Sequence, residues 1–522
     1  MAVIHFSNPI LSGFHPDPSI CRVGSDYYLA NSSFGYFPGV PIFHSQDLVN
    51  WTQIGHCLTR ESQLPLKANH QLANSVSFAG IYAPTIRYHD GRFYLITTNV
   101  SSFRNFVVWA ENAEGPWSEP VDLEWGGIDP SLLFDEGKVY ITGTSDFGGE
   151  PEGIYQAEID LGTGKLVTER RLIWKGTGGR FPEGPHLYRI QDKYYLVIAE
   201  GGTEYGHMVT VARSSSPYGP FESCPHNPVL THRSHPSPIQ ATGHADWVQA
   251  HDGSWWVVFL GIRPAARRNL HHLGRETFLA PIHWSEEGWP IFGINGRVEL
   301  EMEAPVFCLE PQKDDVSSRR DDFDSEALSH SWNSLWNPRE GTRSLQARAG
   351  WLALYGTEAT LDDLEAPTFV GRRQQHFECR ISALMEFDPS EEGEEAGLTA
   401  FMNESAHYEI AVTRKNGVRT IFFRRRIGSL WKVEREEELP AGAVVLGIAA
   451  DADGYQFTYA NPEREEVALG KGESAYLSSE IAGGFTGIYI GMYATGNGKP
   501  CRTPAFFDYF DYQSLISGTC KR

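Results

Sequence analysis

The chain has 522 residues, which is enough for two or three domains with sizeable cores. Its formal net charge of −22 argues against a nucleic-acid partner or an anionic membrane surface and favours a neutral substrate. No run of about 20 apolar residues is present, so we expect no membrane partner. The first residues lack the basic start of a secretion signal, which fits either a cytoplasmic protein, the interpretation we adopt, or a chain from which the signal has been removed.

A short unit recurs five times within the first 260 residues. In the first copy, Asp17-Pro18-Ser19 leads into a strand, a turn at Gly24-Ser25-Asp26 and a second strand. The other copies begin near residues 83, 129, 183 and 243. One such hairpin cannot bury its aromatic face alone, whereas five blades packed around an axis can. The repeat therefore predicts an all-β, five-bladed β-propeller with about four strands per blade.

Acidic residues precede the hairpin in three of the five copies. Asp17, Asp129 and Glu183 hold this position in copies one, three and four, and copy five offers His244. Because the inner strands of a propeller meet at its axis, we expect these side chains to converge at one end of the central channel. Prolines on both sides restrict the backbone of Asp17, which fits either an aimed carboxylate or an ordinary turn.

Two further residues can be placed relative to this end of the channel. Phe34 lies on a Gly/Pro-rich loop after the first hairpin, where an exposed ring either packs between loops or stacks on a sugar face. Arg275 precedes the apolar stretch 278–282, a predicted inner strand, which would direct its guanidinium toward the carboxylates.

The composition changes at about residues 302–325, where the chain becomes polar and turn-like. We therefore expect the propeller to occupy residues 1–310 and a second domain to occupy residues 321–522. This second part lacks the five-fold unit and shows alternating strands such as 351–355 and 488–493. Many strands with turn signals predict a β-sandwich.

Three converging carboxyl groups suit glycoside hydrolysis. One carboxyl must hold a proton for the leaving oxygen, and another must be ionised to activate water. A third acid nearby raises the pKa of the one that stays protonated. The alternative is that the three acids only tie loops to backbone amides, and the residues alone do not decide between these interpretations.

Several motifs, taken together, resemble glycoside hydrolase family 43, in particular its β-xylosidase branch with a C-terminal β-sandwich. The motifs are Asn8-Pro9-Ile10 with residues 14–20, Phe37-Pro38-Gly39-Val40-Pro41, Ala83-Pro84-Thr85-Ile86-Arg87, Ile128-Asp129-Pro130-Ser131-Leu132 and Glu183-Gly184-Pro185-His186-Leu187-Tyr188. The resemblance covers nearly the whole chain. It implies a five-bladed propeller and hydrolysis in a single displacement with inversion.

The resemblance also implies roles for individual residues. Asp17 matches the general base, Glu183 the general acid, and Asp129 the acid that tunes and orients Glu183. His244 falls on the axial histidine of the family, and Arg275 on a ligand of sugar hydroxyls.

The pocket aromatics of the family match Phe34 and, with a departure, Tyr82, where the family usually has tryptophan. In relatives, the sandwich reaches over the propeller mouth with an aromatic residue from near its end. Phe506 and Phe507 are the candidates here, and we assign Phe507 to the substrate site. Some relatives hold a calcium ion in the channel at the axial histidine, so the resemblance allows Ca²⁺ at His244, although the reaction itself needs no cofactor.

The resulting hypothesis is an exo-acting β-xylosidase that releases xylose from short xylo-oligosaccharides, with a side activity on α-L-arabinofuranosides. A sandwich that caps the active-site mouth would favour short substrates. One alternative is arabinofuranosidase as the main activity. Another, of a different class, is a non-catalytic sugar-binding propeller. The sequence leaves the oligomeric state open, a homo-oligomer included.

Overall fold

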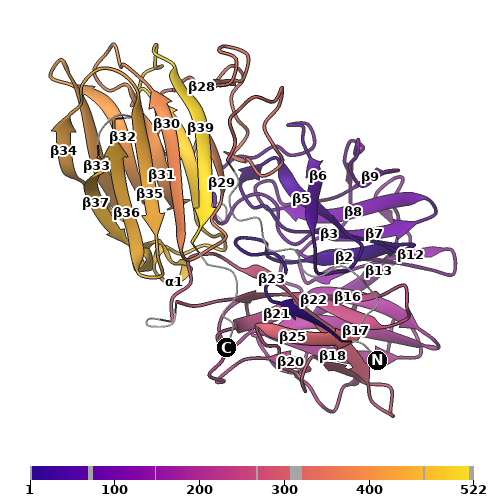
Figure 1. Ribbon diagram of the computed structural model, residues 1–522. Helices are drawn as coiled ribbons and strands as arrows, with labels where there is room; N and C mark the ends of the chain where they lie inside the picture. Colours follow the sequence, from indigo (N-terminus) through magenta and orange to yellow (C-terminus); the bar gives the residue numbers. More distant parts are fainter. Residues whose placement is uncertain are drawn as a thin grey trace.

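The computed structural model describes residues 3–68, 74–146, 148–265, 269–305, 320–461 and 465–515, and these form two β-rich parts (Figure 1). The first carries five antiparallel sheets, and the second carries two large sheets. The predicted all-β fold, a five-bladed β-propeller followed by a β-sandwich, is confirmed. The predicted boundary between 310 and 321 falls largely on residues outside the described set.

The five blades repeat one strand order. Their inner strands contact one another in a closed ring, blade one meeting both blade two and blade five. The strands, innermost first, are β2 (Ser19–Val23), β3 (Asp26–Ala30), β5 (Gly39–Ser45) and β6 (Thr52–Leu58) in blade one; β7 (Thr85–His89), β8 (Arg92–Asn99), β9 (Arg104–Ala110) and β10 (Val121–Asp122) in blade two; β11 (Ser131–Asp135), β12 (Lys138–Thr144), β13 (Ile154–Asp160) and β14 (Lys165–Leu166) in blade three; β16 (Glu183–Ile190), β17 (Lys193–Glu200), β18 (Met208–Ser214) and β19 (Glu222–Ser223) in blade four; and β21 (Gln240–Gln249), β22 (Trp255–Ile262), β23 (Glu276–Trp284) and β24 (Pro290–Phe292) in blade five.

Short strands complete the propeller. Blades three and four each gain one, and β1 pairs with β25 in a separate two-stranded ribbon. These strands are β15 (Arg171–Trp174), β20 (Leu230–Thr231), β1 (Val3–Ser7) and β25 (Glu301–Pro305). Each blade packs an apolar face on the next, because a four-stranded sheet cannot bury both of its faces alone. Tyr195 of blade four and Trp284 of blade five, for example, pack edge to face with ring centroids 5.4 Å apart.

The sandwich consists of a seven-stranded and a six-stranded sheet. In sheet order, the strands are β27 (Arg343–Ser344), β28 (Leu352–Leu354), β39 (Ala505–Ser514), β30 (Cys379–Glu386), β35 (Val444–Ala450), β36 (Gly454–Ala460) and β37 (Val467–Glu473), and then β29 (Thr368–Arg373), β38 (Tyr489–Thr495), β31 (Glu395–Asn403), β32 (Ala406–Lys415), β33 (Val418–Ile427) and β34 (Leu430–Glu438). A single helical stretch, η1 (Ser474–Leu477) with α1 (Ser479–Ala482), lies among the described residues.

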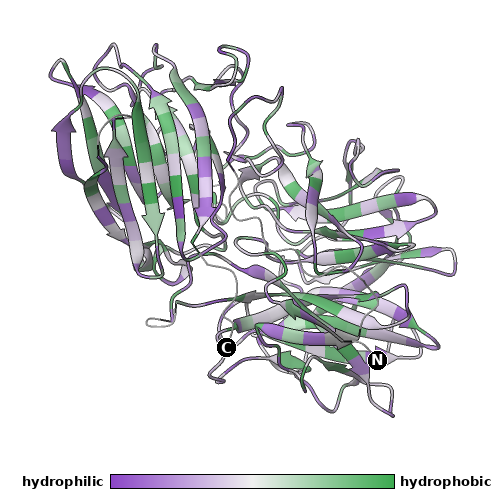
Figure 2. Cartoon of the chain, viewed as in Figure 1, coloured by the Kyte–Doolittle hydropathy of each residue, from purple (hydrophilic) through white to green (hydrophobic). Residues whose placement is uncertain are grey.

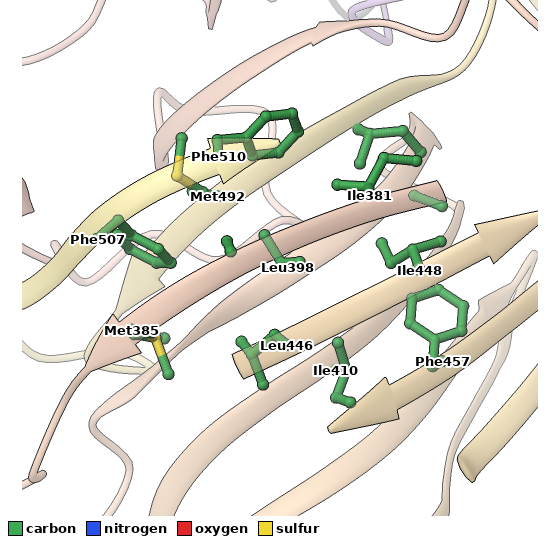
Figure 3. Packing of buried hydrophobic residues seen from close by; sticks show 14 of the residues in the cluster. Ile381, Met385, Leu398, Ile410, Leu446, Ile448, Phe457, Met492, Phe507 and Phe510 are labelled. Atoms are coloured by element: carbon green, nitrogen blue, oxygen red, sulfur yellow. The ribbon is translucent and has the colours of Figure 1, made fainter. Parts of the chain in front are cut away.

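Apolar residues alternate with polar ones along many sandwich strands (Figure 2), as expected when one face of each sheet is buried. Ile381 and Met385 from one sheet meet Leu398 and Ile410 from the other in the core (Figure 3). All four side chains are fully buried.

The two parts are joined by direct contacts as well as by the chain. Strand β26 (Ser334–Leu335), from the beginning of the second part, pairs with β4 (Tyr36–Phe37) of the propeller. Tyr36 stacks on Tyr489 of β38, with ring centroids 3.9 Å apart. The guanidinium of Arg373 donates a hydrogen bond to the backbone carbonyl of Phe14. The sandwich therefore packs against the end of the propeller at which the first hairpin begins. No described helix is long and apolar enough to cross a membrane.

Candidate active site

The three predicted acids stand at the starts of the inner strands of blades one, three and four. Asp17 and Asp129 each lie two residues before an inner strand, and Glu183 is the first residue of β16. The backbones of Asp17 and Asp129 have φ angles of 51° and 53°, in the left-handed region that short polar residues tolerate best. This conformation turns the chain sharply before each strand and so fixes the start of the inner strands.

A backbone contact ties two of these acids together across blades three and four. The Gly184 amide donates a hydrogen bond of 3.0 Å to a carboxylate oxygen of Asp129. Gly184 itself has a φ of 56°, and a Cβ there would lie 2.9 Å from the His244 ring. Only glycine fits this position, which lets the backbone beside Glu183 approach both Asp129 and His244.

Asp17 is held by a salt bridge. Its Oδ1 accepts a 2.7 Å hydrogen bond from Nη1 of Arg275, and the Ser32 hydroxyl donates to Oδ2. His244 Nδ1 lies 4.0 Å from Oδ1 of Asp17. The expected position of Arg275 beside the carboxylates is therefore confirmed. Its proposed contact with sugar hydroxyls remains a prediction.

Glu183 has a different neighbour from Asp17, because Nε2 of His207 lies 3.9 Å from its Oε1, and burial lowers the pKa of this histidine to about 3, so that it is neutral near pH 7. Burial, together with the charges of Asp129 and Asp17, raises the pKa of Glu183 to about 8. Burial and the charge of Asp17 also raise the pKa of Asp129, although His244 and the Gly184 amide oppose the shift. Glu183 nevertheless keeps 21 % of its side chain exposed. One carboxyl of the three thus retains a proton near neutral pH and remains open to a ligand.

Aromatic rings surround the salt bridge between Arg275 and Asp17. Phe34 lies 5.1 Å from Tyr82 and 6.0 Å from Phe485, measured between ring centroids. The guanidinium carbon of Arg275 lies 5.5 Å from the ring centroids of both Phe34 and Phe485. Phe34 is only 2 % exposed, so the expectation of an exposed ring is wrong. The ring packs against Arg275 and keeps that side chain in place.

Tyr82 is half-buried, and its hydroxyl donates a 3.0 Å hydrogen bond to the Phe78 carbonyl. Its polar group is therefore already used within the protein, and burial raises the pKa of Tyr82 well above its ordinary value. The ring remains beside Phe34 and Phe485, as a pocket aromatic would require.

The assignment of Phe507 to the site is wrong. Phe507 is fully buried in the core of the sandwich, where it pairs with Leu352 (Figure 3). Its neighbour Phe506 lies on the other face of β39 and contacts Arg348. The sandwich instead contributes Phe485, from the loop between α1 and β38, whose amide donates to the Ser77 carbonyl. The pair Gly483-Gly484 before it is the sequence signal, because two glycines favour a loop that brings the next residue close to a neighbouring surface.

A polar network that the sequence did not reveal crosses the channel. Arg87 of blade two forms a bidentate salt bridge with Asp246 of blade five and donates to His186 of blade four. Asp246 also accepts a 2.6 Å hydrogen bond from Ser19 of blade one. Although burial opposes ionisation, Arg87 holds the pKa of Asp246 well below its usual range. Since blades two and five are not neighbours in the ring, these bonds lie across the axis.

The axial residues do not fit a calcium ion. Calcium takes six to eight oxygen ligands, whereas the carboxylate that lies 4.0 Å from His244 belongs to Asp17 and is already salt-bridged to Arg275. No group of three or more His, Cys, Asp or Glu side chains within the described ranges could hold a metal. The Arg87 guanidinium already neutralises the carboxylate of the channel. We therefore derive no step through a metal ion.

Two family models match the chain. Glycosyl hydrolases family 43 covers residues 6–290, and the beta xylosidase C-terminal Concanavalin A-like domain covers residues 320–513. The non-reducing end alpha-L-arabinofuranosidase BoGH43B of Bacteroides ovatus is 44 % identical over 98 % of this chain and 95 % of its own. The xylosidase/arabinosidase of Butyrivibrio fibrisolvens is 38 % identical over 98 % and 99 %.

A solved structure agrees with these relatives. Xylan beta-1,4-xylosidase from Bacillus halodurans superposes with a TM-score of 0.90 at 35 % identity and covers 98 % of this chain and 100 % of its own. Similarity over both parts of the chain, together with the shared sheet architecture, identifies the protein as a glycoside hydrolase and sets aside the non-catalytic alternative. The chain belongs to glycoside hydrolase family 43, among its xylosidases and arabinofuranosidases.

Proposed function

We infer that this enzyme removes single xylose units from the non-reducing ends of short β-1,4-xylo-oligosaccharides, with inversion at the anomeric carbon. Glu183 is the general acid, Asp17 the general base, and Asp129 the acid that keeps Glu183 protonated. Activity on α-L-arabinofuranosides accompanies this reaction, since both pentoses expose similar hydroxyl positions.

The observation that carries the proposal is the difference between two carboxyl groups. Glu183 has a pKa of about 8, so it holds a proton at neutral pH and can give it to the leaving oxygen. Asp17 is salt-bridged to Arg275 and hydrogen-bonded to Ser32, which aims a carboxylate toward the same end of the channel. In the inverting reaction, Asp17 takes a proton from water as the water attacks the anomeric carbon, and the glycosidic bond breaks as Glu183 protonates the leaving oxygen.

The sandwich supports an exo mode of action. Phe485 contacts Phe34, Tyr82 and Arg275, so a residue from the second domain lies directly at the acids. A long polysaccharide that extended beyond the acids on both sides, as in endo cleavage, would collide with this loop. A terminal sugar with a short leaving group suits the arrangement better.

Arabinofuranosidase as the main activity is the second candidate. It is favoured by the 44 % identity to an alpha-L-arabinofuranosidase, whereas the xylosidase-named relative from Bacillus subtilis is 35 % identical. The two candidates share the acids and the mechanism and differ only in the preferred sugar.

Proton NMR of the anomeric signals during early hydrolysis of xylobiose tests the reaction. We expect α-xylose to appear first, and first appearance of β-xylose would refute inversion. The ratio of kcat/KM on an aryl β-xyloside and an aryl α-L-arabinofuranoside decides between the two sugars, and a ratio below one would make arabinofuranosidase the main activity.

Variants test the acids themselves. We expect Asp17→Asn and Glu183→Gln each to lower kcat at least about a hundredfold, as general acid and base groups contribute 10² to 10⁴. Glu136→Gln is the matched control, because Glu136 is an exposed acid on a turn of blade three that forms an ion pair with Arg189, away from the three active-site acids. Full activity in either active-site variant would refute its assigned role.

A further inference from the structure

We propose that Phe181 is a platform on which the leaving-group sugar stacks, next to the general acid. This inference rests on the proposed role of Glu183. It adds a binding position for the leaving group, on the other side of the cleaved bond from the terminal sugar. Such a position changes the preference among substrates that share the terminal sugar and differ in the leaving group.

Phe181 is an aromatic residue that the fold leaves open. Its side chain belongs to the exposed large apolar residues, at 53 % exposure, although an aromatic ring gains from burial. One edge lies against Gly202, where an added Cβ would come within 3.1 Å of the ring. The Arg180 guanidinium carbon lies 5.0 Å from the ring centroid. The rest of the ring is open to a ligand.

The backbone of Phe181 is held in a conformation that a bulky residue seldom adopts. Its φ of 55° is in the left-handed region, which is unfavourable for a residue with a large side chain. Its amide donates a 2.8 Å hydrogen bond to Glu152 of the loop between β12 and β13. The next residue is Pro182, whose ring fixes its own φ angle. An unfavourable backbone conformation persists where surrounding contacts enforce it. Here these contacts hold the Phe181 side chain in one orientation.

A buried glutamate anchors the loop that carries this ring. Glu200 is fully buried at the end of β17. One of its oxygens accepts from the Thr177 and Gly179 amides, at 2.8 and 3.0 Å, and the other accepts from the Thr177 and Thr210 hydroxyls. Residues 176–182 are therefore a fixed approach to β16, and Phe181 is held rather than free to swing away.

The position of Phe181 in the chain indicates its ligand. The general acid must lie within hydrogen-bond reach of the oxygen that joins the two sugars. The leaving-group sugar therefore occupies the space immediately around Glu183, on the side opposite the terminal sugar. Phe181 precedes Glu183 by two residues and is exposed. Its ring lies against Gly202, whose neighbour Thr203 accepts a hydrogen bond from Arg275 of the site. The apolar face of a pyranose ring matches an aromatic face without requiring a particular hydrogen bond.

The test compares substrates that share the terminal sugar and differ in the leaving group. For Phe181→Ala we expect kcat/KM on xylobiose and xylotriose to fall about three- to tenfold, the range expected for the loss of one aromatic contact. Hydrolysis of methyl β-xyloside, whose leaving group has no ring, should stay within about twofold of wild type. Phe181→Trp should retain the preference for the disaccharide. If arabinofuranosides are the better substrates, the corresponding arabino-disaccharide and methyl arabinofuranoside replace them.

Controls separate this proposal from the alternatives. Trp431→Ala removes a half-exposed aromatic residue from β34, which lies on the side of the sandwich away from the propeller (Figure 1). This variant should leave kcat/KM unchanged on both the disaccharide and the methyl glycoside. Equal losses on both substrates, or a shifted alkaline limb in the pH profile, would mean that Phe181 only positions Glu183, and unchanged kinetics would also refute the platform. Failure of the proposed function is distinct, because the wild-type enzyme would then leave all of these glycosides intact.

Discussion

Asp129→Asn isolates the electrostatic part of the mechanism. The substitution removes a negative charge and keeps an oxygen that can accept the hydrogen bond from the Gly184 amide. Burial is the largest cause of the raised pKa of Glu183, and the charge of Asp129 is the next. Loss of that charge should therefore lower the pKa of Glu183 without moving the side chain.

The size of the effect follows from the titration of Glu183. With a pKa of about 8, roughly 90 % of Glu183 is protonated at pH 7, whereas at its ordinary value only about 0.3 % would be. A neighbouring charge shifts a carboxyl pKa by about one to two units. A shift to about 6.5 would leave roughly a quarter of the enzyme with a protonated acid at pH 7.

The assay is the pH dependence of kcat/KM, which reports the free enzyme. For wild type we expect activity to fall as the pH rises through about 8, since Glu183 then loses its proton. For Asp129→Asn this alkaline limb should move about one to two pH units lower. An aryl glycoside with a good leaving group needs less acid assistance and should lose less activity. An unmoved limb, or one at higher pH, would refute the role of Asp129.

Three further predictions concern other parts of the molecule. Phe485→Ala should lower kcat/KM about three- to tenfold by removing one aromatic contact, whereas Ile481→Ala, an exposed residue of the same segment, should not; equal effects would refute a site role for the sandwich. Burial lowers the pKa of His407, but hydrogen bonds to Asp362 and Glu409 outweigh this effect and raise the pKa from 6.5 to about 9. These two contacts therefore stabilise the folded state fully below pH 6.5, and their contribution is lost as the pH rises through 9. The contribution is about 3 kcal/mol, and thermal unfolding at pH 6.5 and 9.5 should show a larger loss for wild type than for His407→Gln; equal losses would contradict it. Treatment with EDTA should leave kcat/KM unchanged, because the described residues offer no metal cluster, and recovery of lost activity by added Ca²⁺ would overturn this expectation.

The sequence predicted the architecture because its signals are local. Each inner hairpin carries its own turn and its own apolar strands, and the repeat of that unit is visible without any long-range information. The acids Asp17, Asp129 and Glu183 could be found for the same reason, since each holds the same position in its copy.

Contacts between distant segments could not be predicted in this way. Nothing local relates Arg87 to Asp246, which are 159 residues apart, or Phe485 to Arg275. The error at Phe507 has a different cause. Adjacent residues of a strand face opposite sides, so one of Phe506 and Phe507 had to enter the core, and the alternation alone does not tell which. The structure shows that it is Phe507.

The contribution of Phe485 to the site also orders events during synthesis. The three acids, Arg275 and the five blades all precede residue 306, so a ribosome can release a complete propeller while most of the sandwich is still unmade. The ring and the carbonyl that contact Arg275 come more than 200 residues later. Full activity would therefore be reached only after the sandwich has folded onto the propeller, and a nascent chain that stalls before residue 485 would carry all of its acids and yet lack these two contacts to Arg275.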